Sequence, residues 1–138
     1  MAAVAPEEEL SGSDVYVAGS SAYIAVGSSG LYVVDVRRPV NPQWVASVDT
    51  TAEAKGVYTI IGFAYVADGP AGLQLVNNRE LRSLRIVVSY NTLGETRNVY
   101  GLASTVYVAG SGFGLGVFDV INRSSLNTNG HFLVHPYR

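Results

Sequence analysis

The sequence predicts an all-β fold, a β-propeller to which this chain contributes three four-stranded blades. Three observations predict it: the 138 residues repeat with a period of 42, each repeat consists of apolar runs of strand length, and turn-forming residues separate the runs. A period of about 40 to 45 residues is typical of a propeller blade, a unit that cannot bury both of its faces alone. We therefore expect three similar sheets that pack face to face.

The repeat is anchored by a five-residue pattern, Leu-x-Val/Leu-Val/Phe-Asp/Asn, which occurs at Leu31–Asp35, Leu73–Asn77 and 115–119. The same spacing relates several other sets of residues: Tyr23, Tyr65 and Tyr107; Ala25, Ala67 and Ala109; Gly30, Gly72 and Gly114; and the Val-Tyr pairs that begin at 15, 57 and 99. Because anchors of different kinds stay in register, the three units are expected to fold alike.

Four strands are expected in each unit, because the apolar runs are rich in Val, Ile and Tyr and are bounded by Gly, Pro, Asn or Asp. The expected ranges are 14–19, 22–26, 31–36 and 44–48 in the first unit, 56–61, 63–67, 72–77 and 84–90 in the second, and 98–103, 105–109 and 115–120 in the third. The last strand of the third unit is less obvious. Several runs are apolar at consecutive positions, which predicts sheets that are covered on both faces.

Glycine-rich turns join the second and third expected strands of each unit, at 27–30, 68–72 and 110–114. The segment 110–116 superficially resembles a nucleotide-binding loop. Such a loop needs a following helix that presents its N-terminal amides to a phosphate, whereas 117–120 continues as strand. We therefore interpret all three segments as hairpin turns.

Composition excludes several classes of function. The net charge is −2, with 9 basic against 11 acidic residues, so no basic excess favours nucleic acid as a partner. The absence of cysteine excludes disulfides and thiolate chemistry. No apolar run approaches the roughly 20 residues that span a bilayer, and the first residues do not form a secretory signal. We expect no cofactor and a soluble chain, cytoplasmic as given, with its physiological compartment left open.

The repeated pentapeptide resembles the LVIVD repeat family. The residues that carry the resemblance are Leu31-Tyr-Val-Val-Asp35, Leu73-Gln-Leu-Val-Asn77 and Leu115-Gly-Val-Phe-Asp119. The resemblance runs from Val15 to about Arg123 and implies a β-propeller of a bacterial and archaeal group that is often found in surface or secreted proteins. It implies no catalytic residues. Two departures stand out: Asn77 replaces the Asp, and the pattern fades after Asn122.

The expected organisation is a disordered segment, 1–13, followed by one three-blade unit, 14–138, with blades at about 14–50, 56–92 and 98–138. Three blades would leave two apolar faces exposed, and propellers close with about 4–8 blades. We therefore expect a homo-oligomer, a dimer that closes a six-bladed ring in preference to a nine-bladed trimer. The segment 130–135 is either the fourth strand of the third blade or a strand that crosses to the partner chain.

Two sets of residues invite a metal-binding or catalytic interpretation. The Asp or Asn that ends each pentapeptide could bind calcium or act as an acid, but an Asp before a turn commonly accepts hydrogen bonds from the turn backbone, and we favour that role. His131 and His135 would share one face of an extended segment. No third ligand accompanies them, so we predict no metal site.

The best candidate surface is the loop between the fourth strand of one unit and the first strand of the next. Acid and base recur there in register, as Glu53 with Lys55 and as Glu95 with Arg97. In propellers these loops share a rim with the turns between second and third strands, which would bring Asp68 nearby. These five residues are the predicted ligand contacts at the channel rim. The simpler interpretation of the charged residues is a set of solvated ion pairs, each worth at most about 1 kcal/mol.

The repeats are explained by packing, and no nucleophile, acid–base pair or metal cluster is left over. The preferred function is therefore a non-enzymatic scaffold or binding module, with a protein or a carbohydrate as candidate ligand. One alternative is a hydrolase or lyase whose site is assembled over the channel from the rim residues. Another is a carbohydrate-binding lectin, in which tyrosines would have to stack on sugars because Trp44 is the single tryptophan.

Overall fold

The computed structural model describes residues 11–60, 62–92, 94–102, 105–119 and 131–134. In this part of the chain, twelve strands form three antiparallel four-stranded sheets. The blades contain, in order, β1 (Asp14–Ala18), β2 (Ser21–Ala25), β3 (Leu31–Asp35) and β4 (Gln43–Val48); β5 (Gly56–Ile60), β6 (Phe63–Ala67), β7 (Leu73–Asn77) and β8 (Arg85–Tyr90); and β9 (Glu95–Leu102), β10 (Thr105–Ser111), β11 (Gly114–Asp119) and β12 (His131–Val134). A short 3₁₀ turn, η1 (Leu81–Ser83), lies between β7 and β8. The predicted all-β fold of three four-stranded blades is confirmed.

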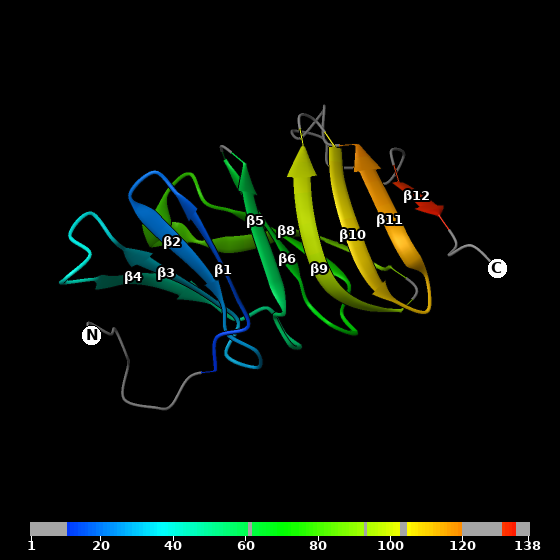
Figure 1. Cartoon of the computed structure of the whole chain (residues 1–138), viewed down its shortest axis with the longest axis horizontal. Coiled ribbons are helices and arrows are strands. Elements are labelled where there is room, and N and C mark those ends of the chain that lie inside the picture. Colours follow the sequence, from blue (N-terminus) through cyan, green and yellow to red (C-terminus); the bar gives the residue numbers. More distant parts are fainter. Residues whose placement is uncertain (1–10, 61, 93, 103–104, 120–130, 135–138) are drawn as a thin grey trace.

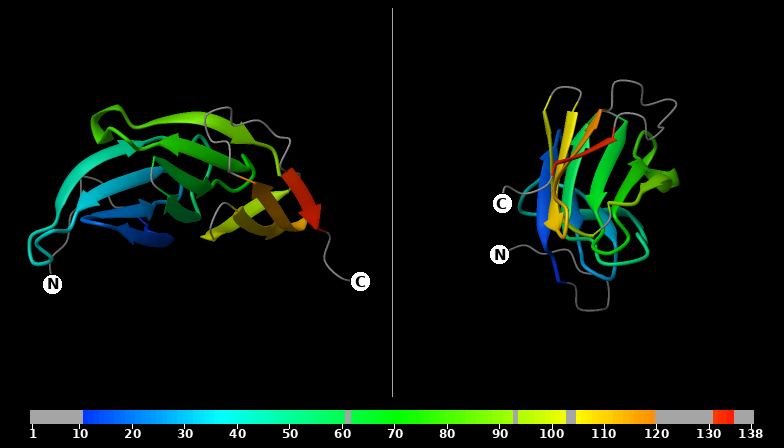
Figure 2. Two further views of the ribbon diagram at one scale, coloured as in Figure 1. Left: turned by 90° about the horizontal axis from the view of Figure 1, so that it is seen from above. Right: turned by 90° about the vertical axis from the view of Figure 1, so that its right-hand side faces the viewer.

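The three sheets are stacked along an arc, as Figures 1 and 2 show. The first strands β1, β5 and β9 are neighbours along the inner side of the arc, and β4 and β8 lie on its outer side. After each fourth strand the chain returns to the inner side to begin the next blade. This is how blades are arranged around the channel of a propeller.

The tail supplies the fourth strand of the third blade. β12 pairs antiparallel with β11, from Leu115 opposite Val134 to Phe118 opposite His131. Of the two alternatives for this segment, the chain therefore adopts the one in which it completes its own blade. The prediction of disorder for residues 1–13 falls mainly outside the described residues.

Two apolar junctions hold the blades together. Between the first and second blades, Leu31 and Val33 of β3 pack in one cluster with Val66 of β6. Between the second and third blades, Leu75 of β7 packs in a second cluster with Val108 of β10. Every residue of β6 is buried, which confirms for the middle blade the prediction that both faces are covered.

The polar residue that ends each pentapeptide shapes the turn that follows it. Asp35 Oδ1 accepts a hydrogen bond of 2.9 Å from the backbone N–H of Arg37, and Asn77 Oδ1 accepts one of 3.0 Å from that of Arg79. The predicted turn-forming role is confirmed at both positions. An amide oxygen can also accept this bond, which is why Asn77 replaces Asp without a change of fold.

The third blade departs from the predicted boundaries. β9 begins at Glu95, earlier than the expected residue 98, and β10 continues to Ser111 with a shift of register at Ala109/Gly110. A Cβ atom at Gly110 would overlap the carbonyl oxygen of Glu95, so glycine permits this close extra pairing. The second blade has Asp68 at the equivalent position, and its two strands are shorter.

No helix in the described residues is long and apolar enough to cross a bilayer.

Candidate functional site

One rim of the arc is formed where the turns between second and third strands meet the loops that enter the next blade. Gly27 and Ala54 exchange two backbone hydrogen bonds of 3.0 and 2.9 Å, and Gly69 and Thr96 exchange another two of the same lengths. The prediction that these turns and loops share a rim is therefore confirmed. Each pair also ties one blade to the next by its backbone.

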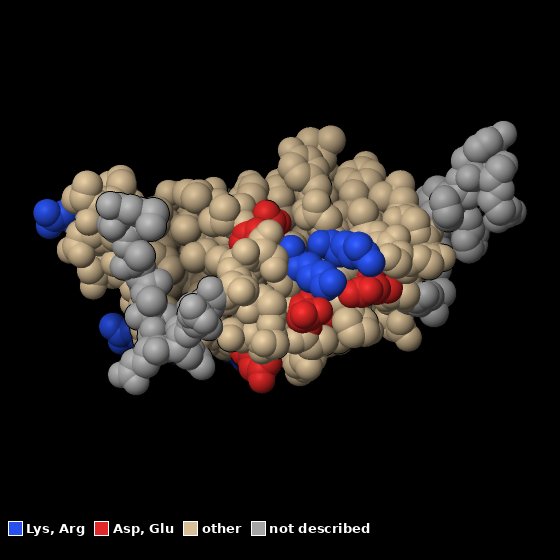
Figure 3. Space-filling view, turned by 60° about the horizontal axis from the view of Figure 1, so that its bottom comes forward, with Lys and Arg blue, Asp and Glu red and all other residues tan. Residues whose placement is uncertain are grey.

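Four of the five predicted rim residues form a connected line of alternating charge. Lys55 Nζ lies 2.8 Å from Glu95 Oε2 across the junction of the second and third blades, and 3.8 Å from Glu53 Oε1 in its own loop. Arg97 Nη2 lies 3.7 Å from the other oxygen of Glu95. Figure 3 shows this side of the molecule, where basic and acidic side chains lie close together.

The electrostatics of the line favour the ionised form of Glu95. The hydrogen bond and the charge of Lys55 lower the pKa of Glu95, and Arg97 adds a smaller effect of the same sign. Because these side chains are 29–58% exposed, solvent screens the pairs and they contribute little to folding. Chemically, the line offers paired charges for a polar partner.

Asp68 lies beneath the rim and not on it. Its side chain is fully buried, and its carboxylate accepts hydrogen bonds of 2.7 Å from Thr50 Oγ1 and 3.2 Å from Gln74 Nε2. Burial raises the pKa of Asp68, and the hydrogen bonds from Thr50, Gln74 and the Ala52 backbone oppose that rise. The side chain braces the loop at 49–55 against its neighbouring turn, so a ligand on the rim would not touch it directly.

A stack of tyrosines on the inner strands was missed by the sequence reasoning. Tyr16, Tyr58 and Tyr100 come from β1, β5 and β9, with ring centroids 4.6 and 5.3 Å apart. The signal was present in the Val-Tyr pairs that recur every 42 residues. What the sequence did not show is that successive first strands lie close enough for these rings to touch.

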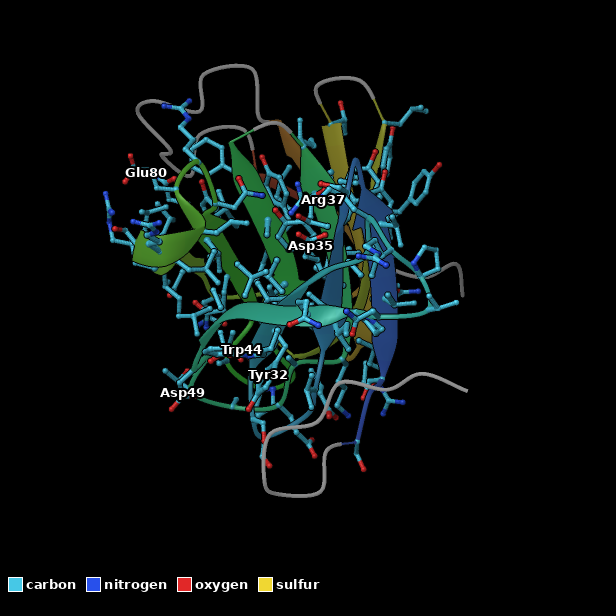
Figure 4. All side chains as sticks on the ribbon, turned by 90° about the vertical axis from the view of Figure 1, so that its left-hand side faces the viewer. Tyr32, Asp35, Arg37, Trp44, Asp49 and Glu80 are labelled. Carbon is cyan, nitrogen blue, oxygen red and sulfur yellow. The ribbon has the colours of Figure 1, made fainter. Side chains whose placement is uncertain are left out.

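Both ends of the arc expose apolar side chains among the described residues. Val15 and Val17 are 56% exposed on the first blade, and Figure 4 looks onto this end, where Tyr32 and Trp44 are labelled. The opposite end, on the third blade, exposes the side chains of Tyr100, Leu102, Tyr107 and Leu115.

The described residues contain no group of three or more His, Asp or Glu side chains that could hold a metal ion. The side chains of His131 and His135 lie outside the described residues, so the interpretation of these two histidines stays a prediction.

Comparison with known proteins finds a solved structure of similar fold and a matching repeat family. The crystal structure of the computationally designed Ika8 protein is similar, with a TM-score of 0.64 and 5% sequence identity over 78% of this chain. The match covers 33% of the designed chain, so this chain spans about a third of that protein's length. At this identity the likeness concerns the fold alone.

A search of curated proteins finds no relative of this chain. The sequence pattern of the LVIVD repeat matches residues 11–50, 53–92 and 94–134, and the chain therefore belongs to the LVIVD repeat family.

Proposed function

We propose that this chain is a non-enzymatic interaction module whose first partner is a second copy of itself, joined head to tail into a closed ring. One observation carries the proposal. The two outer faces of the arc correspond to the two halves of a junction that the chain already forms twice within itself. Each outer face would find its complement on another copy.

Residues one period apart illustrate this complementarity. Each internal junction buries a leucine of one blade and a valine of the next, namely Leu31 with Val57 and Leu73 with Val99. One period further on, the leucine is Leu115, which is 37% exposed. The matching valine at the start of the repeat is Val15, which is 56% exposed. A second copy would bring these two residues into the same kind of contact.

The tyrosine stack extends the same argument. Tyr58 contacts Tyr16 on one side and Tyr100 on the other, whereas Tyr100 is 61% exposed at the end of the stack. Head-to-tail association would place Tyr16 of a second copy against Tyr100. Two such junctions between two copies would close a ring of six blades, within the range of about 4–8 that propellers adopt.

A binding role fits the rim better than catalysis does. The charged residues of the rim are paired with one another at the surface, and Lys55 holds Glu95 in its ionised form. A general acid or base needs a pKa near the working pH, whereas the pKa of Glu95 is moved away from it. The ring would thus present a polar rim to a partner.

The test measures mass in solution for the wild type, V15K and L115E. We expect the wild type to have the mass of two chains. The two variants should fold and have the mass of one chain, because each places a charge in an apolar junction. Mixing V15K with L115E should restore association, since one junction of the mixed pair is then fully wild type and the other opposes Lys to Glu. V40K is the matched control, because Val40 is 82% exposed and lies between β3 and β4.

A wild type that has the mass of one chain at micromolar concentration overturns the proposal. So does a dimer that survives both substitutions, because its interface would then lie elsewhere.

A further inference from the structure

A cleft opens between the first and second blades at the rim opposite the charged line. Its volume is about 620 Å³, within the range of roughly 300–1,000 Å³ that is typical of small-molecule sites. The lining combines aromatic rings with a few polar groups: Tyr16, Tyr23, Tyr58, Thr59, Asn78 and Arg79. The cleft lies apart from the charged rim, and it shares Tyr16 with the tyrosine stack that the proposed junction would extend.

Two polar groups of the cleft are held together by a hydrogen bond. Asn78 Nδ2 donates a hydrogen bond of 3.1 Å to the hydroxyl of Tyr23, which is almost fully buried. Burial raises the pKa of Tyr23 and of Tyr58, so both hydroxyls keep their protons at neutral pH. The cleft therefore offers hydroxyl groups beside an aromatic wall formed by Tyr16 and Tyr58.

Comparison of the repeats distinguishes the polar pair Asn78 and Arg79 from its counterpart in the first blade. In the first blade the equivalent residues are Val36 and Arg37, and Arg37 makes an ion pair of 2.6 Å with Asp35. In the second blade the acid is replaced by Asn77, which still forms the turn but carries no charge. The arginine is retained and its internal carboxylate partner is lost.

Arg79 is held at the cleft by contacts that leave its charge available. Its guanidinium lies 5.7 Å from the centre of the Phe63 ring, and its Nε atom lies close above Gly62 in the turn between β5 and β6. Within the described residues, Arg79 makes no ion pair with an acidic side chain. A cation in this position, next to aromatic rings and hydrogen-bonding groups, is complementary to an anionic ring-shaped ligand.

We propose that the cleft binds a uronic acid unit, a sugar ring that carries a carboxylate. The carboxylate pairs with Arg79, the ring lies against Tyr16 and Tyr58, and the sugar hydroxyls exchange hydrogen bonds with Asn78 and the tyrosine hydroxyls. This site deepens the binding role proposed above. It lies within one chain, however, and does not require the ring of two copies.

The test is a calorimetric titration of the full chain with D-glucuronate, with D-glucose and benzoate as comparison ligands. We expect glucuronate to bind more tightly than both, because glucose lacks the charge and benzoate lacks the hydroxyls. R79Q should weaken glucuronate binding by about tenfold or more, in line with the loss of a hydrogen bond to a charged group. R37Q removes an arginine from the same repeat position in the first blade and should leave binding unchanged.

A further variant, N77D, tests the repeat argument directly. It restores the carboxylate that occupies this position in the first blade, so Arg79 should pair internally as Arg37 does, and glucuronate binding should fall as in R79Q. Circular dichroism and thermal unfolding of each variant establish that the fold is retained.

Four results would overturn the uronate site: no binding of glucuronate, equal binding of glucose or benzoate, wild-type affinity in R79Q, or an equal loss in R37Q. The L115E variant separates this proposal from self-association. Glucuronate binding by an L115E monomer supports the site, whatever the mass of the wild type. If the wild type is a monomer and still binds glucuronate, the proposed ring of two copies is wrong and the uronate site is retained.

Discussion

Leu73 and Leu115 occupy the same position in successive repeats, and truncating each to alanine should have different consequences. Leu73 is fully buried between two blades, so L73A leaves a cavity and should cost about 2–5 kcal/mol of unfolding free energy. Leu115 is 37% exposed in a single chain. Because part of its surface is already in water, L115A should cost about 1–2 kcal/mol when the chain is alone.

Self-association changes the expected cost of L115A and not that of L73A. If a second copy covers Leu115, the cost of L115A should rise with protein concentration and approach that of L73A, since binding to the folded state adds to its apparent stability. Urea unfolding followed by circular dichroism, at two protein concentrations about a hundredfold apart, measures both costs. L31A, at the equivalent buried position of the first blade, should behave as L73A does.

Equal costs for L73A and L115A at every concentration would refute this reasoning, because the exposed face would then be covered within one chain. A cost for L115A that stays small and independent of concentration would show that no second copy packs on it.

Three further predictions concern the turns, the buried acid and the tryptophan. G72A should cost at least about 2–3 kcal/mol of unfolding free energy, because Gly72 has a φ of 89° and a Cβ there would overlap the Tyr90 carbonyl oxygen. G19A should cost only about 1 kcal/mol, because Gly19 has a φ of 60° and no atom near its Cβ position. Thermal unfolding of both variants compares the two costs. The pKa of Asp68 is raised on folding, so the folded state binds its proton more tightly and Asp68 makes stability fall as pH rises above its ordinary value of 3.8. Other carboxylates also titrate in this range, so the stability of the wild type relative to D68N is the quantity that should fall as pH rises. Urea unfolding of both proteins across the range measures it, and parallel pH profiles would contradict the assignment. The emission of Trp44, which is 52% exposed at the free end of the first blade, should shift to the blue as protein concentration rises, and a constant spectrum in dilution would argue that this end stays in water.

Sequence alone determined the features that depend on local chemistry and on periodicity. A strict spacing of 42 predicted three equal blades, and the strands of the first two blades begin and end within one residue of their predicted limits. The turn role of Asp35 and Asn77 was predictable for the same reason, because a side chain that bonds to the backbone two residues on needs no distant partner.

Tertiary structure decided which side chains meet across blades. The charges of Lys55 and Glu95 were visible in the sequence, but they are 40 residues apart and only the stacking of blades joins them. Asp68 was predicted at the rim and is buried beneath it, because its turn packs onto the loop that carries Thr50. Asn77 was noted as a departure from the repeat, yet its effect on Arg79 depends on the position of Phe63 and on the cleft between two blades. Each of these contacts joins residues whose proximity is set by how whole sheets pack, and a period read along one chain does not contain that information.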